Sequence, residues 1–204
     1  RDRFEIPVSD KLINEAPFCR FPAKSREYEY LMERRRALGG FVPQRKVRSV
    51  PLDAPPLKLF AEFLQGSGER KVATTMALVR MLARLMADPY YGKLIVPIVP
   101  DEARTFGMDS LFRSYGIYAH GGQLYEPVDV HLLMRYEERR NGQILEEGIS
   151  EAGAMASFMA AGSAYATHGL ATIPFFLFYS MFGFQRIGDL IWAAGDMRCR
   201  GFVI

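Results

Sequence analysis

The sequence predicts an α/β domain with a mostly parallel sheet and helices on both faces, preceded by a proline-rich connecting arm. Two apolar runs, residues 93–100 and 171–178, show no alternation of polar and apolar side chains, which is typical of strands covered on both faces. Segments with a helical spacing of apolar residues alternate with such runs, and this order favours parallel strand pairing. We expect the arm over residues 1–70 and the α/β domain over residues 71–204, cut short at its C-terminal end.

Length and composition limit the classes of function. The chain has 204 residues, of which 49% are hydrophobic and 24% charged, so it suits one globular domain with an appendage. A net charge of +3 is too small to indicate nucleic-acid binding. The basic runs at residues 34–36 and 139–140 directly follow acidic residues, so solvated helix faces explain them better than phosphate binding does.

Cysteines, histidines and apolar runs give no sign of a metal site or a membrane span. Cys19 and Cys199 lie far apart without metal or redox spacing, which favours a reducing cytoplasm. The three histidines are scattered without a ligand pattern. The first ten residues lack the apolar core of a signal peptide, and the longest apolar run, residues 170–184, is shorter than the ~20 residues that span a bilayer. We therefore expect a cytoplasmic chain without membrane contact.

The arm is defined by its prolines. Seven of the twelve prolines lie in residues 1–67, and this density prevents long regular elements. Residues 25–38 can still form one helix, capped by Ser25 and ended by Gly39 and Gly40. We expect the arm to wrap over another part of the protein.

The domain begins with a helix at residues 71–86, which Asp88-Pro89 ends, and a strand at residues 93–100. Charged residues from Asp101 to Arg104 follow this strand, at the edge where an open α/β sheet usually holds its ligands. An internal salt-bridge group that fixes the loop is the plain alternative, and the residues alone slightly favour it.

The rest of the domain repeats the strand and helix pattern. Residues 106–148 are expected to be a long connection, ordered by its aromatic residues, that ends in a short strand at residues 143–145. A helix then begins near Glu151. Residues 171–178 form the next strand, which leads into a helix that extends to about residue 194, and residues 199–204 form a final strand.

Glu151 is the candidate for chemistry. It shares one helix face with Met155, Phe158 and Gly162, so its carboxylate is expected to lose hydration, which predicts a raised pKa suited to proton transfer near neutral pH. Glu151 also falls in the first helical turn, where the helix dipole favours an acid without any catalytic purpose. The pattern alone favours this second, structural interpretation.

Several longer motifs identify a family. The motifs are LMERR (31–35), ALGG (37–40), VPDEARTFGM (99–108), GQIL (142–145), EGI with Glu151, and YSMFGFQRIGD (179–189). With these motifs the chain resembles the homodimeric bacterial type of pyruvate dehydrogenase E1 component, a thiamine diphosphate enzyme, although it covers only a middle portion of that family's sequence. The resemblance implies the pyrimidine-binding domain, with magnesium and diphosphate held by residues outside this chain and the cofactor at a dimer interface. It also implies that the chain alone does not turn over substrate.

The resemblance assigns roles residue by residue. Glu151 aligns with the glutamate that hydrogen-bonds N1′ of the aminopyrimidine and so promotes its proton-accepting imino form, which reverses the structural interpretation. Ile149 is expected to lie against the pyrimidine and Phe182 to stack on it, although core packing explains both residues as well.

Further roles follow from the same resemblance. Tyr179 and Arg186 match residues near the substrate, where a hydroxyl and a cation can orient a carboxylate, although Arg186 taken alone suggests a surface or interface arginine. Asp101 is expected near the cofactor and Glu102 near the substrate, both close to the subunit boundary. The substrate is then pyruvate, and the acetyl group passes to a lipoyl-bearing E2 acetyltransferase.

Departures and alternatives accompany this interpretation. Ser150 and Ala152 stand where related chains often carry Asn and Leu, which can alter the pocket's shape. The same chemistry on a longer acid such as 2-oxobutyrate is one alternative. A non-catalytic α/β assembly module, in which Glu151 merely starts a helix, is the other.

Overall fold

The computed structural model describes residues 1–40, 49–101, 103–133 and 135–204. The chain divides into two compact units, Arg1–Lys46 and Val47–Ile204. Residues 49–70, which we expected to complete the arm, group with the second unit. The boundary of the functional domain at residue 70 stays a prediction.

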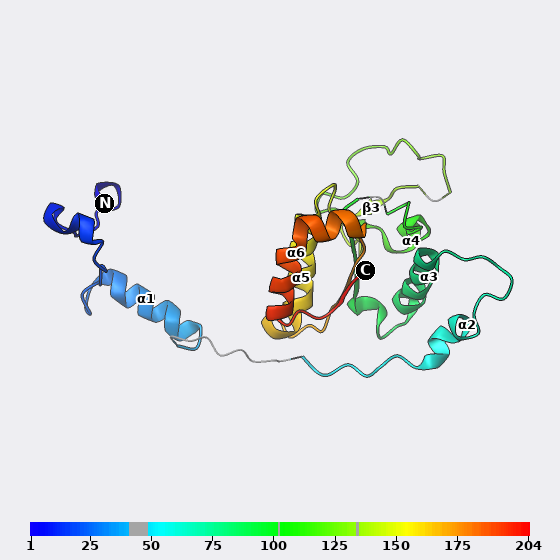
Figure 1. The fold of residues 1–204 in the computed structure, drawn as a ribbon, viewed down its shortest axis with the longest axis horizontal. Helices are drawn as coiled ribbons and strands as arrows, with labels where there is room; N and C mark the ends of the chain where they lie inside the picture. Colours follow the sequence, from blue (N-terminus) through cyan, green and yellow to red (C-terminus); the bar gives the residue numbers. More distant parts are fainter. Residues whose placement is uncertain (41–48, 102, 134) are drawn as a thin grey trace. The chain divides into compact units, whose positions relative to one another are not determined.

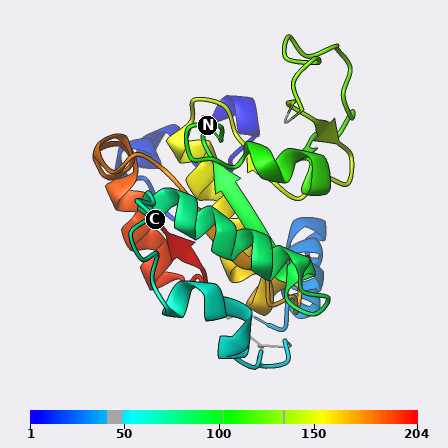
Figure 2. The ribbon, with the colours of Figure 1, turned by 90° about the vertical axis from the view of Figure 1, so that its right-hand side faces the viewer.

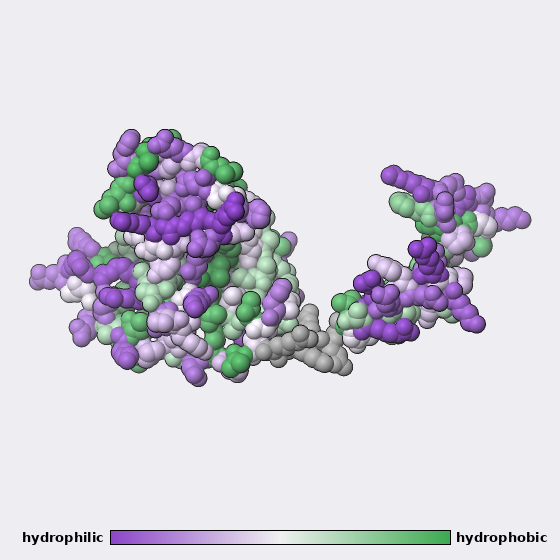
Figure 3. Space-filling model, turned by 180° about the vertical axis from the view of Figure 1, so that it is seen from behind, coloured by the Kyte–Doolittle hydropathy of each residue, from purple (hydrophilic) through white to green (hydrophobic). Residues whose placement is uncertain are grey.

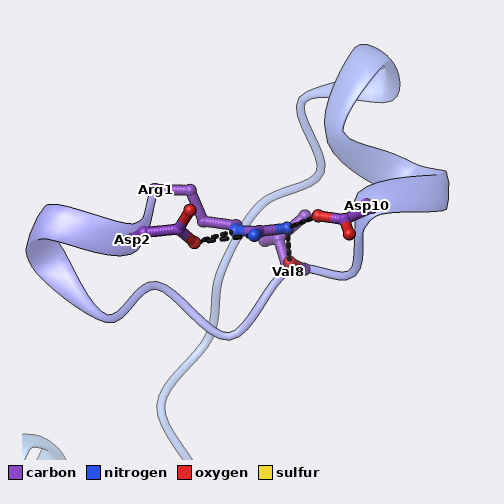
Figure 4. Close-up of polar contacts among 4 residues, drawn as sticks. All are labelled: Arg1, Asp2, Val8 and Asp10. Atoms are coloured by element: carbon purple, nitrogen blue, oxygen red, sulfur yellow. Dashed lines mark hydrogen bonds and ion pairs between the residues drawn. The ribbon is translucent and has the colours of Figure 1, made fainter.

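The first unit has little core of its own. Within residues 1–40, none of its helices contains a buried residue, and these helices include the predicted helix as α1. Ser25 caps α1 by accepting a hydrogen bond from the Tyr28 backbone N–H at 3.2 Å. The Arg1 guanidinium contacts both Asp2 and Asp10 and donates to the Val8 carbonyl (Figure 4). The bounds are η1 Asp2–Phe4, η2 Asp10–Glu15 and α1 Arg26–Ala37.

The second unit is built on a four-stranded parallel sheet, which confirms the predicted fold class. The strand order is β4-β1-β5-β6, and the β1–β5 register places Ile95 opposite Ile173 and Ile98 opposite Phe176. A second, two-stranded parallel sheet lies next to β4, joined by a bridge between Ile117 and Ile144. The strands are β1 Ile95–Val99, β2 Ile117–Tyr118, β3 Glu138–Arg139, β4 Leu145–Glu146, β5 Ile173–Phe176 and β6 Phe202–Val203.

Each face of the sheet supports a separate hydrophobic core. On β1, Ile95 and Val99 pack with α3 and α4, whereas Ile98 packs with α5 and α6. This is the reason why the strand sequence shows no polar alternation. Figures 1 and 2 show the helices on opposite sides of the sheet. The helices are α2 Ala61–Leu64, α3 Thr74–Ala87, α4 Asp109–Tyr115, α5 Glu151–Thr167 and α6 Ser180–Asp196, with short η3 Leu57–Phe60 and η4 Gly92–Leu94.

The predicted long connection at residues 106–148 contains more regular structure than expected. It includes the helix α4 and the strands β2 and β3. The helix is only 7 residues long, too short to show a clear helical period, and Gly116 ends it with a φ of 67°. The prediction of a long connection ordered by its aromatic residues did not specify these elements.

Within the described residues, no helix is long and apolar enough to cross a bilayer.

Candidate functional site at the carboxyl edge of the sheet

The candidate site lies where the strand order reverses. From β1 the chain continues to β4 on one side of β1, and β5 lies on its other side. Open α/β sheets bind ligands in the crevice at such a switch point, outside the carboxyl ends of the strands. Here the hydroxyl groups of Thr105, after β1, and Tyr179, after β5, lie 2.7 Å apart. The rings of Phe106 and Tyr179 are also in contact, with centroids 5.1 Å apart.

Glu151 begins α5 at the same edge. The chain leaves β4 through Gly148, whose φ of 68° makes the turn, and Ser150 caps the helix by accepting from the Gly153 N–H at 3.1 Å. Glu151 is only 8% exposed, so it is buried as predicted. One guanidinium nitrogen, Nη1 of Arg186, donates to both of its carboxylate oxygens, at 2.7 Å each.

The expectation of a raised pKa for Glu151 was wrong. The hydrogen bond from Arg186 holds the pKa of the Glu151 carboxyl below its ordinary value and outweighs the opposing effect of burial. Glu151 is therefore a carboxylate at neutral pH. The sequence pattern missed this because Arg186 comes from α6 and its distance from Glu151 is set by helix packing.

Four of the predicted site residues form one continuous row. The Arg186 guanidinium lies 4.9 Å from the ring centroid of Phe182, which is close enough for a cation–π contact. The Phe182 ring in turn lies 6.5 Å from the ring of Tyr179, edge to face. The row from Glu151 through Arg186 and Phe182 to Tyr179 therefore runs from a buried acid to partly exposed aromatic rings.

The remaining predicted residues are less closely joined to this row. Ile149 lies in the turn before Glu151 with 82% of its surface exposed. Asp101, half-buried, lies two residues after the end of β1 and close enough to Glu146 to affect its pKa. Glu102 lies outside the described residues, so its predicted role stays a prediction.

Glu146 is the acid at this edge that residue patterns did not single out. Burial raises the pKa of its carboxyl, and the nearby Asp101 adds to the effect, although the Ala103 N–H donates to Oε1 at 3.5 Å. Its other oxygen, Oε2, is buried and has no hydrogen-bond partner among the described residues. The feature that could have identified Glu146 as a site residue was its position as the last residue of β4.

The site has the composition of an organic ligand site. Across residues 1–40, 49–101, 103–133 and 135–204, no three His, Cys, Asp or Glu side chains gather in a way that could hold a metal ion. A buried carboxylate, a guanidinium and exposed aromatic rings suit a flat, nitrogen-containing group better. The fold and this edge define the class: an α/β domain with a candidate ligand site at the carboxyl ends of a parallel sheet.

Comparison with known proteins identifies the family. Residues 49–204 match the family described as "Pyruvate dehydrogenase E1 component middle domain". The chain belongs to this family, as its motifs indicated.

Named relatives cover the whole chain. It is 56% identical over 204 residues to the pyruvate dehydrogenase E1 component of Pseudomonas aeruginosa and 52% identical over 205 residues to that of Cupriavidus necator. It is 47% identical over 205 residues to that of Escherichia coli. In each case the match covers 100% of this chain and 23% of the relative, so the chain spans about a quarter of their length.

Proposed function

We propose that this chain is the pyrimidine-binding segment of an E1 component that decarboxylates pyruvate with thiamine diphosphate and transfers the acetyl group to the lipoyl group of an E2 acetyltransferase. The relatives that carry the name pyruvate dehydrogenase E1 component support the activity. The observation that carries the proposal is the buried, ionised Glu151 beside exposed aromatic surface at the switch point of the sheet.

The residues present fit the aminopyrimidine part of the cofactor. Phe182 is 40% exposed and Ile149 is 82% exposed, so both offer free apolar surface to a flat ring. One nitrogen of Arg186 donates a hydrogen bond to each of the two oxygens of Glu151. An ionised carboxylate has about four acceptor positions, so some of them stay open. Glu151 therefore keeps the capacity to accept a further hydrogen bond, from the N1′–H of the pyrimidine's imino form.

Thiamine diphosphate, when bound, supplies the carbon nucleophile and the electron sink that loss of carbon dioxide requires. The chain's residues then have distinct tasks. Glu151 would accept a hydrogen bond from N1′–H of the imino form and so favour that form, and Arg186 keeps Glu151 ionised and fixes its orientation. The half-exposed side chain of Arg186 and the hydroxyl of Tyr179 are suited to orient the carboxylate of a 2-oxo acid. Asp101 and Glu102 act at the border of the cofactor and substrate sites.

The same proposal includes a homodimer and a magnesium ion whose ligands lie outside this chain. Exposed aromatic residues on α6, Phe184 at 62% and Trp192 at 81%, support burial of this helix against another subunit. A cytoplasmic location is supported by the two cysteines, which are both free.

The test replaces Glu151 by Gln in the full-length protein. We expect acetyl transfer to the lipoyl group, measured after loss of carbon dioxide, to fall by about 10²–10⁴-fold because Gln cannot share a proton with N1′ and so no longer promotes the proton-accepting imino form. The exposed Glu69, replaced by Gln, is the matched control and should retain wild-type turnover. Near wild-type turnover of Glu151→Gln would remove Glu151 from the mechanism.

The chain length of the substrate needs a separate comparison. One methylene group is worth about 10–200-fold in kcat/KM in a hydrophobic pocket. We expect pyruvate to exceed 2-oxobutyrate by a factor in this range. The opposite preference would assign the same chemistry to the longer acid.

A further inference from the structure

A cavity outside the Glu151 site has a different composition from that site. Its volume is about 550 Å³, and it shares no lining residue with the row from Glu151 to Tyr179. It is formed by α4, by β3 and by the long loop between β2 and β3. At the top of the larger unit in Figure 3, hydrophobic and strongly hydrophilic side chains lie side by side over this loop. The lining comprises three arginines, one histidine, two leucines and one glutamate.

The cavity carries excess positive charge. Arg113, Arg135 and Arg139 contribute three charges and Glu137 removes one, which leaves +2 with His131 neutral. Glu137 is already bound by Arg139, whose Nε and Nη2 donate to Oε1 at 2.8 and 2.6 Å. The two uncompensated charges therefore belong to Arg113 and Arg135.

These two arginines are open to a ligand. Both side chains are exposed, and neither guanidinium has a hydrogen bond or ion pair with any residue that the structure describes. Arg139, by contrast, is held in place, because Nη2 also donates to the Arg113 backbone carbonyl at 2.6 Å. Arg139 is thus restrained, whereas the Arg113 and Arg135 guanidinium groups that line the same cavity are not. Two like charges in one cavity repel each other, and a bound anion would remove that repulsion.

The shape and charge together indicate the class of ligand. A cavity of this volume is in the range of small-molecule sites, about 300–1,000 Å³. A guanidinium group presents donors in a planar fork that matches phosphate and carboxylate. Leu132 and Leu133, 56% and 81% exposed, add apolar surface at the same cavity.

We propose that this cavity binds a small organic anion with two or more phosphate or carboxylate groups, held between Arg113 on α4 and Arg135 on the loop. Such a ligand would connect the loop to α4. It is separate from the cofactor and substrate of the proposed function, and the proposal does not depend on them.

The test is calorimetric titration of the full chain with two probes, pyrophosphate and citrate. We expect saturable binding of at least one probe at one site per chain. Binding of pyrophosphate alone would assign the site to phosphates, and binding of citrate alone to carboxylates. Absence of saturable binding for both probes would overturn the proposal.

Matched variants locate the site. The double variant Arg113→Gln/Arg135→Gln should weaken binding at least about tenfold, since it removes two charged donors. The control Arg20→Gln/Arg140→Gln changes the net charge equally with exposed arginines outside the cavity and should leave affinity unchanged. Equal weakening in both would indicate non-specific attraction and would refute the site.

A conservative variant guards against misfolding. Arg113→Lys/Arg135→Lys keeps both charges and removes the planar fork, so we expect an intermediate affinity, together with an unchanged urea midpoint. Wild-type affinity in this variant would contradict recognition through the guanidinium groups.

Discussion

The hydroxyl groups of Thr105 and Tyr179 lie 2.7 Å apart and join the loop after β1 to the start of α6. The two loops leave neighbouring strands on either side of the switch point. This contact therefore lies at the edge of the sheet where open α/β folds usually bind a ligand.

Replacing Tyr179 by Phe tests that contact. We expect the free energy of unfolding of the chain, measured in urea, to fall by about 0.5–1.5 kcal/mol, the net worth of one hydrogen bond. Because Tyr179 is 44% exposed, we expect the loss of stability to fall at the lower end of this range. Tyr118→Phe, at a similarly exposed tyrosine on β2, should change stability by less than about 0.5 kcal/mol. Equal losses in the two variants would argue against a specific role of the contact.

The ion pair between Arg186 and Glu151 predicts a definite pH dependence. The pKa of Glu151 is lowered in the folded chain, so its contribution is present above the ordinary glutamate pKa of about 4.3 and is lost as the pH falls through the lowered value. We expect Arg186→Gln to destabilise the chain by about 1 kcal/mol at pH 7, a modest value because solvent screens the half-exposed Arg186. Urea unfolding at several pH values should show this difference shrinking below about pH 4. A difference that grows toward acid would contradict the assignment.

Glu146 predicts a pH dependence of stability opposite to that of Glu151. Burial raises its pKa, so folding is favoured while the carboxyl is protonated and loses that advantage as the pH rises through the raised value. Glu146→Gln removes the titrating charge. The free energy of unfolding of this variant, relative to that of the wild type, should therefore increase from about pH 4 to pH 7. Glu69→Gln, at an exposed glutamate, should show a flat difference over the same range. A constant difference for Glu146→Gln would mean that its carboxyl is hydrated.

Gly162 permits a close approach between α5 and the turn before β6. The Arg200 N–H donates to the Gly162 carbonyl at 2.9 Å, and a Cβ at residue 162 would lie 2.7 Å from the Arg200 carbonyl oxygen. We expect Gly162→Ala to destabilise the chain by about 1–3 kcal/mol through overpacking, measured by urea unfolding.

Gly195→Ala is the matched control for this substitution. Gly195 lies in α6 with nothing within 4 Å of its added Cβ, so alanine should stabilise the helix by up to about 1 kcal/mol. Stabilisation by both substitutions would show that the backbone at Gly162 has room to move.

The sequence predicted the helices and strands better than the side-chain contacts between them. The strands at Ile95 and Ile173 were predictable because burial on both faces leaves its mark on consecutive residues. The burial of Glu151 followed from its helix face in the same way. Its pKa did not, because Arg186 reaches it from another helix and only the packing of α5 on α6 decides that distance. The raised pKa of Glu146 likewise depends on its burial and on nearby Asp101, neither of which a local pattern specifies.

The most direct measurement is a crystal structure of the full-length protein with thiamine diphosphate and magnesium bound. The proposed function predicts a carboxylate oxygen of Glu151 within about 2.6–3.2 Å of N1′ of the pyrimidine, with the ring of Phe182 against that heterocycle. A pyrimidine whose N1′ meets a different acid, with Glu151 bound only to Arg186, would contradict it.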